Sequence, residues 1–209
     1  IFTMDAFPPR YYESLDFQSL WKEFPTGDQF LKSTYLMSKD ELWALQNTRF
    51  LTQMQRAWQI PFYQRHWGKI GMQAGDIKSL ADLNQIPPFD VNDLRDAIDR
   101  APPWGDFVAL DLEKNNPMPL VLQTSGGTTG LPRAMVYSPK DREVMNINTG
   151  RRLFMQGVRP FDVIQVMLSL GLSNGGFLIR EGIWKYSGAV PVMTGSGAQT
   201  PTRRQIEIM

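Results

Sequence analysis

The hydrophobic and polar positions divide the chain into a helical first part and a second part in which short apolar runs alternate with helical patterns. Ser38 and Glu41 have the spacing of a capping box, and the segment 38–59 has the period of a helix. Four large apolar residues share one face of that helix and predict a buried stripe: Trp43, Phe50, Met54 and Trp58. Pro61 should end the helix, and a shorter helix should begin near Asp90 or Asn92.

The second part predicts strands and helices in alternation. The apolar runs expected as strands are 119–124, 133–138, 162–170 and 189–195. Helical patterns run from Ser138 to Gly157, with Pro139 at the first helical position, and from Gly175 to Gly188. The run 162–170 is nearly continuously apolar, which favours burial on both faces.

These patterns predict an α/β fold. A helical N-terminal portion should lead into a β-α-β layer with a parallel or mixed sheet and right-handed crossovers. A last helix should begin at Thr200 as N-cap, with Pro201 in its first turn.

Composition narrows the class of protein. The 209 residues are 42% hydrophobic and 21% charged with a net charge of +1, which gives no reason to expect nucleic acid or an anionic membrane as partner. The absence of cysteine excludes disulfides and zinc–thiolate sites, and a single histidine, His66, makes no metal site by itself. The sequence has neither a membrane-spanning run nor the features of a signal peptide, so the cytoplasm is the expected location.

The stretch "LQTSGGTTGLPR" at 122–133 has the composition of a phosphate-binding loop. Its glycines let backbone N–H groups approach an anion, its hydroxyls donate hydrogen bonds, and its arginine adds a charged donor. The candidate nucleotide-binding residues are Ser125, Gly126, Gly127, Thr128, Thr129, Gly130 and Arg133. The alternative is a plain flexible hairpin between two strands. The P-loop and dinucleotide-binding fingerprints are both absent.

"TSGGTTGLPR" also resembles the signature loop of the acyl-adenylate-forming (AMP-binding) enzymes. Flanking segments such as "IPFYQRHW" and "GLSNGGFLIREG" resemble the phenylacetate–CoA ligase branch in order and spacing. The resemblance covers about residues 38–209, which would form the first part of a large N-terminal adenylation domain. Residues 1–37 are an unassigned extension.

The resemblance implies activation of a carboxylic acid, aryl or arylalkyl, in two steps. ATP with Mg²⁺ converts the acid to an acyl-adenylate, and coenzyme A then takes the acyl group; a homodimer is one assembly it allows. By the same analogy the residues at the acid pocket are Leu170, Ser173, Asn174, Gly175 and Gly176. The two glycines would open a helix whose N-terminus favours a carboxylate or phosphate, or they would only permit close packing.

Two departures from the family pattern qualify this expectation. Phenylacetate enzymes carry aromatic residues in place of Leu170 and Ser173, and Arg180 or Lys185 could meet a second negative charge on the substrate or face solvent. The adenine and ribose motifs, the acidic magnesium ligand and the catalytic lysine are not found before Met209. The chain is therefore expected to be an N-terminal fragment, inactive by itself. The alternatives are an adenylylating relative that does not use coenzyme A and a non-catalytic nucleotide-binding fragment.

Overall fold

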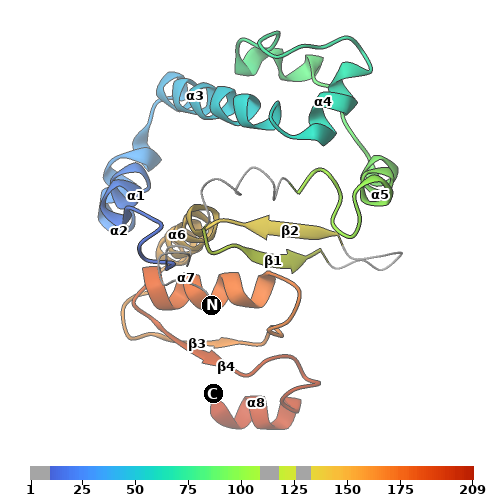
Figure 1. The fold of residues 1–209 in the computed structure, drawn as a ribbon. Helices are drawn as coiled ribbons and strands as arrows, with labels where there is room; N and C mark the ends of the chain where they lie inside the picture. The colour runs from blue at the N-terminus through green and yellow to red at the C-terminus, as the bar shows by residue number, and fades with distance from the viewer. Residues whose placement is uncertain (1–9, 109–117, 126–132) are drawn as a thin grey trace, which may run out of the picture. The chain divides into compact units, whose positions relative to one another are not determined.

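The computed structural model describes residues 10–108, 118–125 and 133–209 and divides the chain into two compact units (Figure 1). Unit 1 combines Ile1–Tyr35 with Pro117–Met209, and unit 2 is Leu36–Asn116. A short 3₁₀ turn, Thr34–Leu36, lies where the first part of unit 1 passes into unit 2.

Unit 2 is helical. Its elements are α3 (Lys39–Ala57), α4 (Pro61–Gly68), the 3₁₀ helix η3 (Leu80–Gln85) and α5 (Val91–Arg100). Both predicted helix starts are confirmed: Ser38 forms a capping box with Glu41, and Asp90 caps α5. Apolar side chains of α3 and α4 share a cluster around Met54 and Trp67.

Two details of unit 2 differ from expectation. Phe50, Met54 and Trp58 join the cluster as predicted. Trp43, two helical turns before Phe50, is 50% exposed, because the described cluster does not extend to it. Pro61 does not end α3, which stops at Ala57; it begins α4 instead. Proline suits a first helical turn, where its fixed φ is already helical and its missing N–H has no partner to lose.

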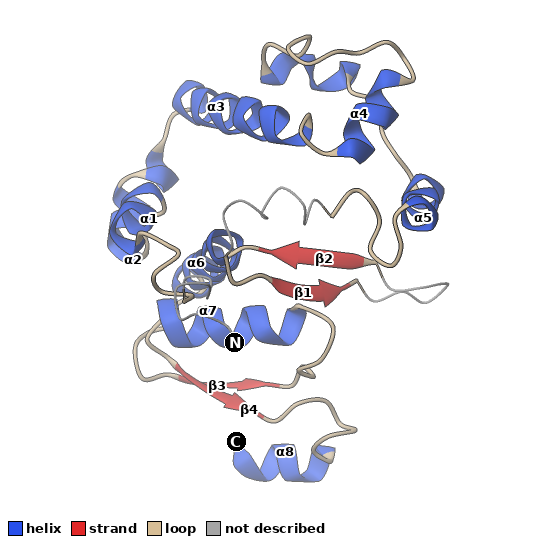
Figure 2. Cartoon of the chain, viewed as in Figure 1, coloured by secondary structure: helices blue, strands red, loops and turns tan. Residues whose placement is uncertain are grey.

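Unit 1 contains both pairs of strands (Figure 2). Its elements are α1 (Phe17–Glu23), α2 (Gly27–Lys32), β1 (Val121–Thr124), β2 (Ala134–Tyr137), α6 (Pro139–Met155), β3 (Val163–Val166), α7 (Gly175–Tyr186), β4 (Val190–Met193) and α8 (Thr202–Ile208). Strands β1 and β2 are antiparallel, whereas β3 and β4 are parallel and joined through α7. The α/β class with a β-α-β unit and mixed strand pairing is confirmed.

The predicted helix starts in unit 1 are right for α6 and one residue early for α8. Ser138 forms the α6 capping box with Asp141 and places Pro139 in the first turn, as expected. Thr200 does not cap α8: Pro201 is the N-cap, and the Thr200 N–H instead bonds the Ser196 carbonyl in the preceding turn.

Strand β3 is not buried on both faces within the described residues. Val166 is 3% exposed and packs against α7, but Val163 is 70% exposed. The reason is that β3 pairs with β4 alone among the described strands, so continuous apolar character does not by itself guarantee two covered faces.

The centre of unit 1 is the contact between α6 and α7. Ile147 on α6 is fully buried against Leu20 and Phe24 of the N-terminal segment. On the α7 side, Ile183 is buried with Val166 of β3. The two helices approach closely at glycines: a Cβ on Gly182 would meet the Thr149 side chain and lie 3.2 Å from the Asn146 carbonyl oxygen.

Replacing Gly182 by alanine should therefore destabilise unit 1. Overpacking costs about 1–3 kcal/mol, and the better helix propensity of alanine offsets about 1 kcal/mol of that. The measurement is the urea unfolding midpoint. Gly68→Ala, a helical glycine with open space around its Cβ position, is the matched control and should hold or gain stability. An equal response of the two variants would contradict close packing at Gly182.

Candidate functional site

Strands β1 and β2 form the stem of the glycine-rich segment. Gly126, Gly127, Thr128, Thr129 and Gly130 lie outside the described residues. At the two ends of the segment, the Ser125 N–H donates to the Arg133 carbonyl oxygen at 3.0 Å, and Thr124 stands opposite Ala134. The Ser125 amide is thus engaged in the stem, which leaves its hydroxyl as the group for a ligand; Arg133 is exposed.

The same stem lies against the segment expected at the acid pocket. The Thr124 N–H donates to the Leu172 carbonyl oxygen at 2.8 Å. Leu170 is half-buried and Ser173 is exposed. A backbone hydrogen bond therefore joins two stretches that are about 50 residues apart in sequence.

The two glycines at the N-terminus of α7 have different surroundings. A Cβ on Gly176 would meet the Ser169 carbonyl oxygen, so close packing requires this glycine, whereas Gly175 is exposed with only Ser173 Oγ nearby, at 3.9 Å. Asn174 is the N-cap but makes no side-chain cap bond. Free N–H groups in a first helical turn, with the helix dipole, favour an anion. The acid-pocket assignments remain predictions; Gly175 is the exposed glycine of the two, and its N–H donates to Ser173 Oγ at 3.5 Å.

The side chain of Asn174 faces inward. It is buried, and its Oδ1 accepts a hydrogen bond of 2.6 Å from Arg142 Nη1. Arg142, on α6, also donates to Gln123 Oε1 at 3.2 Å and to Glu181 Oε1 at 3.0 Å. The sequence pattern did not single out Arg142, Gln123 or Glu181. The sequence shows Gln123 as a polar residue in a largely apolar strand, and Arg142 and Glu181 as charged residues on the helices α6 and α7.

The buried carboxylate of Glu143 is the acceptor for three side chains. It is 1% exposed and accepts hydrogen bonds from Tyr11 (2.7 Å), Lys185 (2.7 Å) and Tyr186. Burial and then the neighbouring Glu143 raise the pKa of the Tyr11 and Tyr186 hydroxyls. Both tyrosines are therefore neutral donors at any physiological pH.

The two cations considered for a second negative charge on the substrate have internal partners. Lys185 pairs with Glu143 and, at 3.2 Å, with Glu181. Arg180 pairs with Glu181 at 3.3 Å and lies over the Phe177 ring. Lys185 thus pairs with the buried Glu143 and the partly buried Glu181, whereas Arg180 pairs with Glu181 and its buried Nε has no hydrogen-bond partner among the described residues.

Glu181 should make part of the stability of unit 1 dependent on pH. Burial alone would raise the pKa of its carboxyl, but Lys185 and Arg142 outweigh burial and lower the pKa below its ordinary value of 4.5. The unfolded chain then binds the proton at a higher pH than the folded one. The stabilisation is full above the unfolded pKa and is lost as pH falls through the folded pKa.

We expect Glu181→Gln to flatten the fall of the melting temperature between about pH 5 and pH 3. The matched control is Glu207→Gln, which alters an exposed helix pair with Arg203 and Arg204. Thermal unfolding as a function of pH is the measurement. Parallel melting curves for wild type and Glu181→Gln would contradict the prediction.

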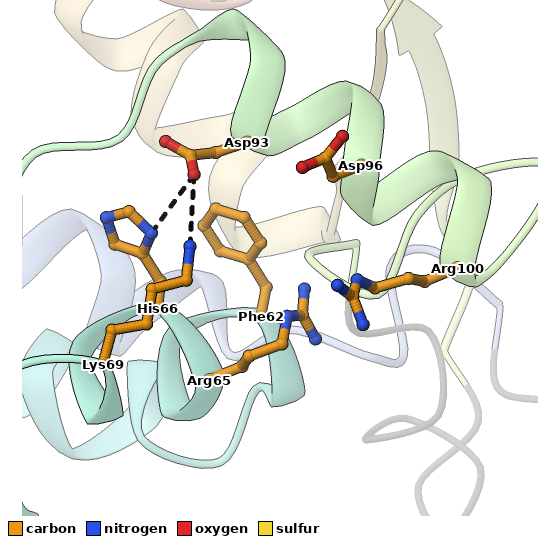
Figure 3. Close-up of a pocket in the computed structure, with 7 residues that line it drawn as sticks. All are labelled: Phe62, Arg65, His66, Lys69, Asp93, Asp96 and Arg100. Atoms are coloured by element: carbon orange, nitrogen blue, oxygen red, sulfur yellow. Dashed lines mark ion pairs between the residues drawn. The ribbon is translucent and has the colours of Figure 1, made fainter.

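Unit 2 has a small charged hollow between α4 and α5 (Figure 3). Asp93 Oδ1 lies 3.6 Å from both His66 Nδ1 and Lys69 Nζ. The Asp90 N–H first, and then His66 and Lys69, lower the pKa of the Asp93 carboxyl. The hollow, about 30 Å³, has room for about one water molecule, so we interpret it as a structural cross-link between helices.

A larger cavity of unit 2 is about 440 Å³ and is lined by residues of α3 and the following loops, including Met54, Trp58 and Ile77. It contains none of the residues predicted for the nucleotide or the acid. In the described ranges no group of three or more histidine or acidic side chains could hold a metal ion. None of the described helices has a stretch long and apolar enough to cross a lipid bilayer.

Comparison with solved structures identifies the class. The chain is similar to 2-hydroxyisobutyryl-CoA ligase in an open conformation with 2-HIB-AMP and CoA, with a TM-score of 0.71 and 26% identity over 82% of this chain and 39% of that one. The thioesterification state of the same ligase gives a TM-score of 0.71 and 28% identity over 82% and 35%. No model of a protein family matches the chain. The fold is that of an acyl-adenylate-forming ligase.

Curated relatives narrow the class. The phenylacetate–coenzyme A ligase of Aromatoleum evansii is 32% identical over 173 residues, which are 82% of this chain and 36% of the relative. That of Escherichia coli K12 is 31% identical over 170 residues, 81% and 36%. The chain belongs to the phenylacetate–CoA ligase branch of the acyl-adenylate-forming superfamily. It spans about a third of the length of these relatives.

Proposed function

We propose that the complete gene product activates a carboxylic acid with ATP and passes the acyl group to coenzyme A. The acid carboxylate would attack the α-phosphate, releasing pyrophosphate and leaving an acyl-adenylate. The thiol of coenzyme A would then displace AMP. The solved neighbours that contain 2-HIB-AMP and CoA support this order of events.

The observation that carries the proposal is the contact between β1 and the segment before α7. The Thr124 N–H donates to the Leu172 carbonyl oxygen at 2.8 Å, and this link between the strand before the glycine-rich segment and the stretch that contains Leu170 and Ser173 supports the proposal. The candidate phosphate-binding residues and the candidate acid-binding residues therefore belong to the same unit, unit 1. Electrostatic stabilisation of the leaving pyrophosphate is the task that the hydroxyls and N–H groups of such a segment suit.

The cofactors follow from this chemistry. ATP would be held by Ser125, Arg133 and the residues between them. Mg²⁺ would enter bound to ATP. Among the described residues no group of three or more histidine or acidic side chains could hold the ion. Coenzyme A would act after adenylate formation. We expect the protein in the cytoplasm, where these small molecules are available.

The identity of the acid is open to a direct screen. Leu170 and Ser173 stand where phenylacetate enzymes carry aromatic residues, so the proposed aryl or arylalkyl acids should be tested beside a small branched acid. The complete gene product is incubated with ATP, Mg²⁺ and phenylacetate, benzoate or 2-hydroxyisobutyrate, and pyrophosphate release is measured. Acid-dependent release is the expected result; no release with any acid would refute the proposal.

The second candidate is a relative that stops at the adenylate or uses another acceptor. Products formed with and without coenzyme A separate it from the first. A thioester that appears only when coenzyme A is present supports the ligase, whereas an acyl-adenylate that persists in its presence supports the alternative.

A further inference from the structure

One buried guanidinium joins the two halves of the candidate site. Arg142 is 6% exposed. Its Nη1 donates both to Gln123 on β1 and to Asn174 at the start of α7, at 3.2 and 2.6 Å. Arg142 itself comes from α6, so three elements meet at one side chain.

The arrangement is rigid for physical reasons. A guanidinium is planar, and its donors point in fixed directions, so the two acceptors on Nη1 are held at a fixed separation. Its charge is balanced by Glu181 Oε1, 3.0 Å from Nη2. Glu181 is held in turn by Asn146, at 3.0 Å, and by Lys185. Removal of Glu181 alone would leave the buried charge of Arg142 without its carboxylate partner, which is strongly destabilising.

The guanidinium reinforces a backbone link. Gln123 precedes Thr124, whose N–H bonds the Leu172 carbonyl, and Leu172 lies two residues before Asn174. Strand β1 and the segment 170–174 are thus joined twice, once through the main chain and once through Arg142. Because the links are separate, they restrict both the distance between β1 and the segment 170–174 and the rotation of one relative to the other.

We infer that Arg142 is a positioning residue for adenylate formation, holding the strand that leads into the nucleotide-binding segment in register with the segment that receives the acid. The inference rests on the function proposed above. Attack requires the carboxylate oxygen within about 3–3.5 Å of the α-phosphorus, and a displacement of about 1 Å can reduce the rate by about 100-fold. Arg142 acts through Gln123 and Asn174 and does not touch the reacting atoms.

Two variants of the complete gene product test this role. Arg142→Lys keeps the charge but replaces the fork with a single point donor. The double variant Arg142→Met/Glu181→Gln removes both charges, so it lacks the bridge without stranding a carboxylate. The control is Glu143→Gln, the next residue on α6, equally buried but bonded to Tyr11, Lys185 and Tyr186 rather than to the site segments.

Two readouts are combined: kcat and KM for pyrophosphate release, and hydrogen exchange of the segment 121–125. Both Arg142 variants should lower kcat by about 100-fold with a smaller change in KM. They should also speed exchange at Thr124 by about 10- to 100-fold, the equivalent of a lost charged hydrogen bond. Glu143→Gln should lower the melting temperature and leave kcat and the Thr124 exchange rate unchanged.

An active enzyme in which Arg142→Lys loses no more kcat than Glu143→Gln, or leaves Thr124 exchange unchanged, overturns the inference alone. Wild-type protein that releases no pyrophosphate with any acid, while the Arg142 variants still accelerate exchange, overturns the proposed function and with it the catalytic part of the inference. The two failures are therefore distinguishable.

Discussion

Replacing Thr128 and Thr129 together by alanine is expected to lower kcat for acid-dependent pyrophosphate release by about 100- to 1,000-fold, the usual effect of removing hydrogen-bond donors to a developing negative charge. The substitutions leave the stem of the segment intact, because that stem is made by the backbone pairing of β1 with β2. The loss should therefore appear in the rate and not in the melting temperature.

Thr52→Ala is the matched threonine control. Thr52 lies on α3 and its hydroxyl donates to the carbonyl of Thr48 on the same helix, so its replacement should leave the rate as it is. If the double variant Thr128→Ala/Thr129→Ala retains full activity, the segment does not bind the nucleotide phosphates.

Glu143→Ala should lower the free energy of unfolding by about 3–5 kcal/mol, the cost of breaking a buried ion pair by removing one partner. The change leaves the Tyr11 and Tyr186 hydroxyls without their acceptor and takes one of two carboxylates from Lys185. Urea unfolding at neutral pH measures the difference.

The control for this stability prediction is Glu207→Ala, which removes an exposed pair on α8 and should cost about 0–1 kcal/mol. A loss for Glu143→Ala as small as that of the control would mean that the carboxylate is hydrated in solution rather than buried. The milder Glu143→Gln should fall between the two, since it keeps the shape of the side chain.

Local chemistry explains which parts of the fold could be predicted from sequence. Ser38 and Ser138 allow the starts of α3 and α6 to be predicted, because a capping box is complete within four residues. Pro61 and Thr200 were misassigned because each lies where two local rules compete: proline breaks one helix and begins the next, and a threonine can serve a turn instead of a cap. The exposure of Trp43 and Val163 depends on what packs against them, which periodicity does not contain.

The candidate site divides in the same way. The residue types predict the glycine-rich segment and its position between two strands. They do not predict the hydrogen bond between Thr124 and Leu172, because that contact joins distant parts of the chain. Arg142 and Glu181 were missed for the same reason: charged residues on predicted helices are usually solvated. For Lys185 the sequence left open a substrate charge or solvent, and the structure pairs it with the buried Glu143 and with Glu181.

The packing of the first described residues against α6 bears on how the protein can be shortened. Leu20 and Phe24 cover Ile147, and the Tyr11 hydroxyl reaches Glu143. Trimming the chain to begin at Leu36 would strip the cover from the helix that carries Arg142 and open an apolar surface to solvent. The N-terminal extension, which the sequence left unassigned, therefore stabilises α6 through these contacts. Truncated variants of the protein should retain it.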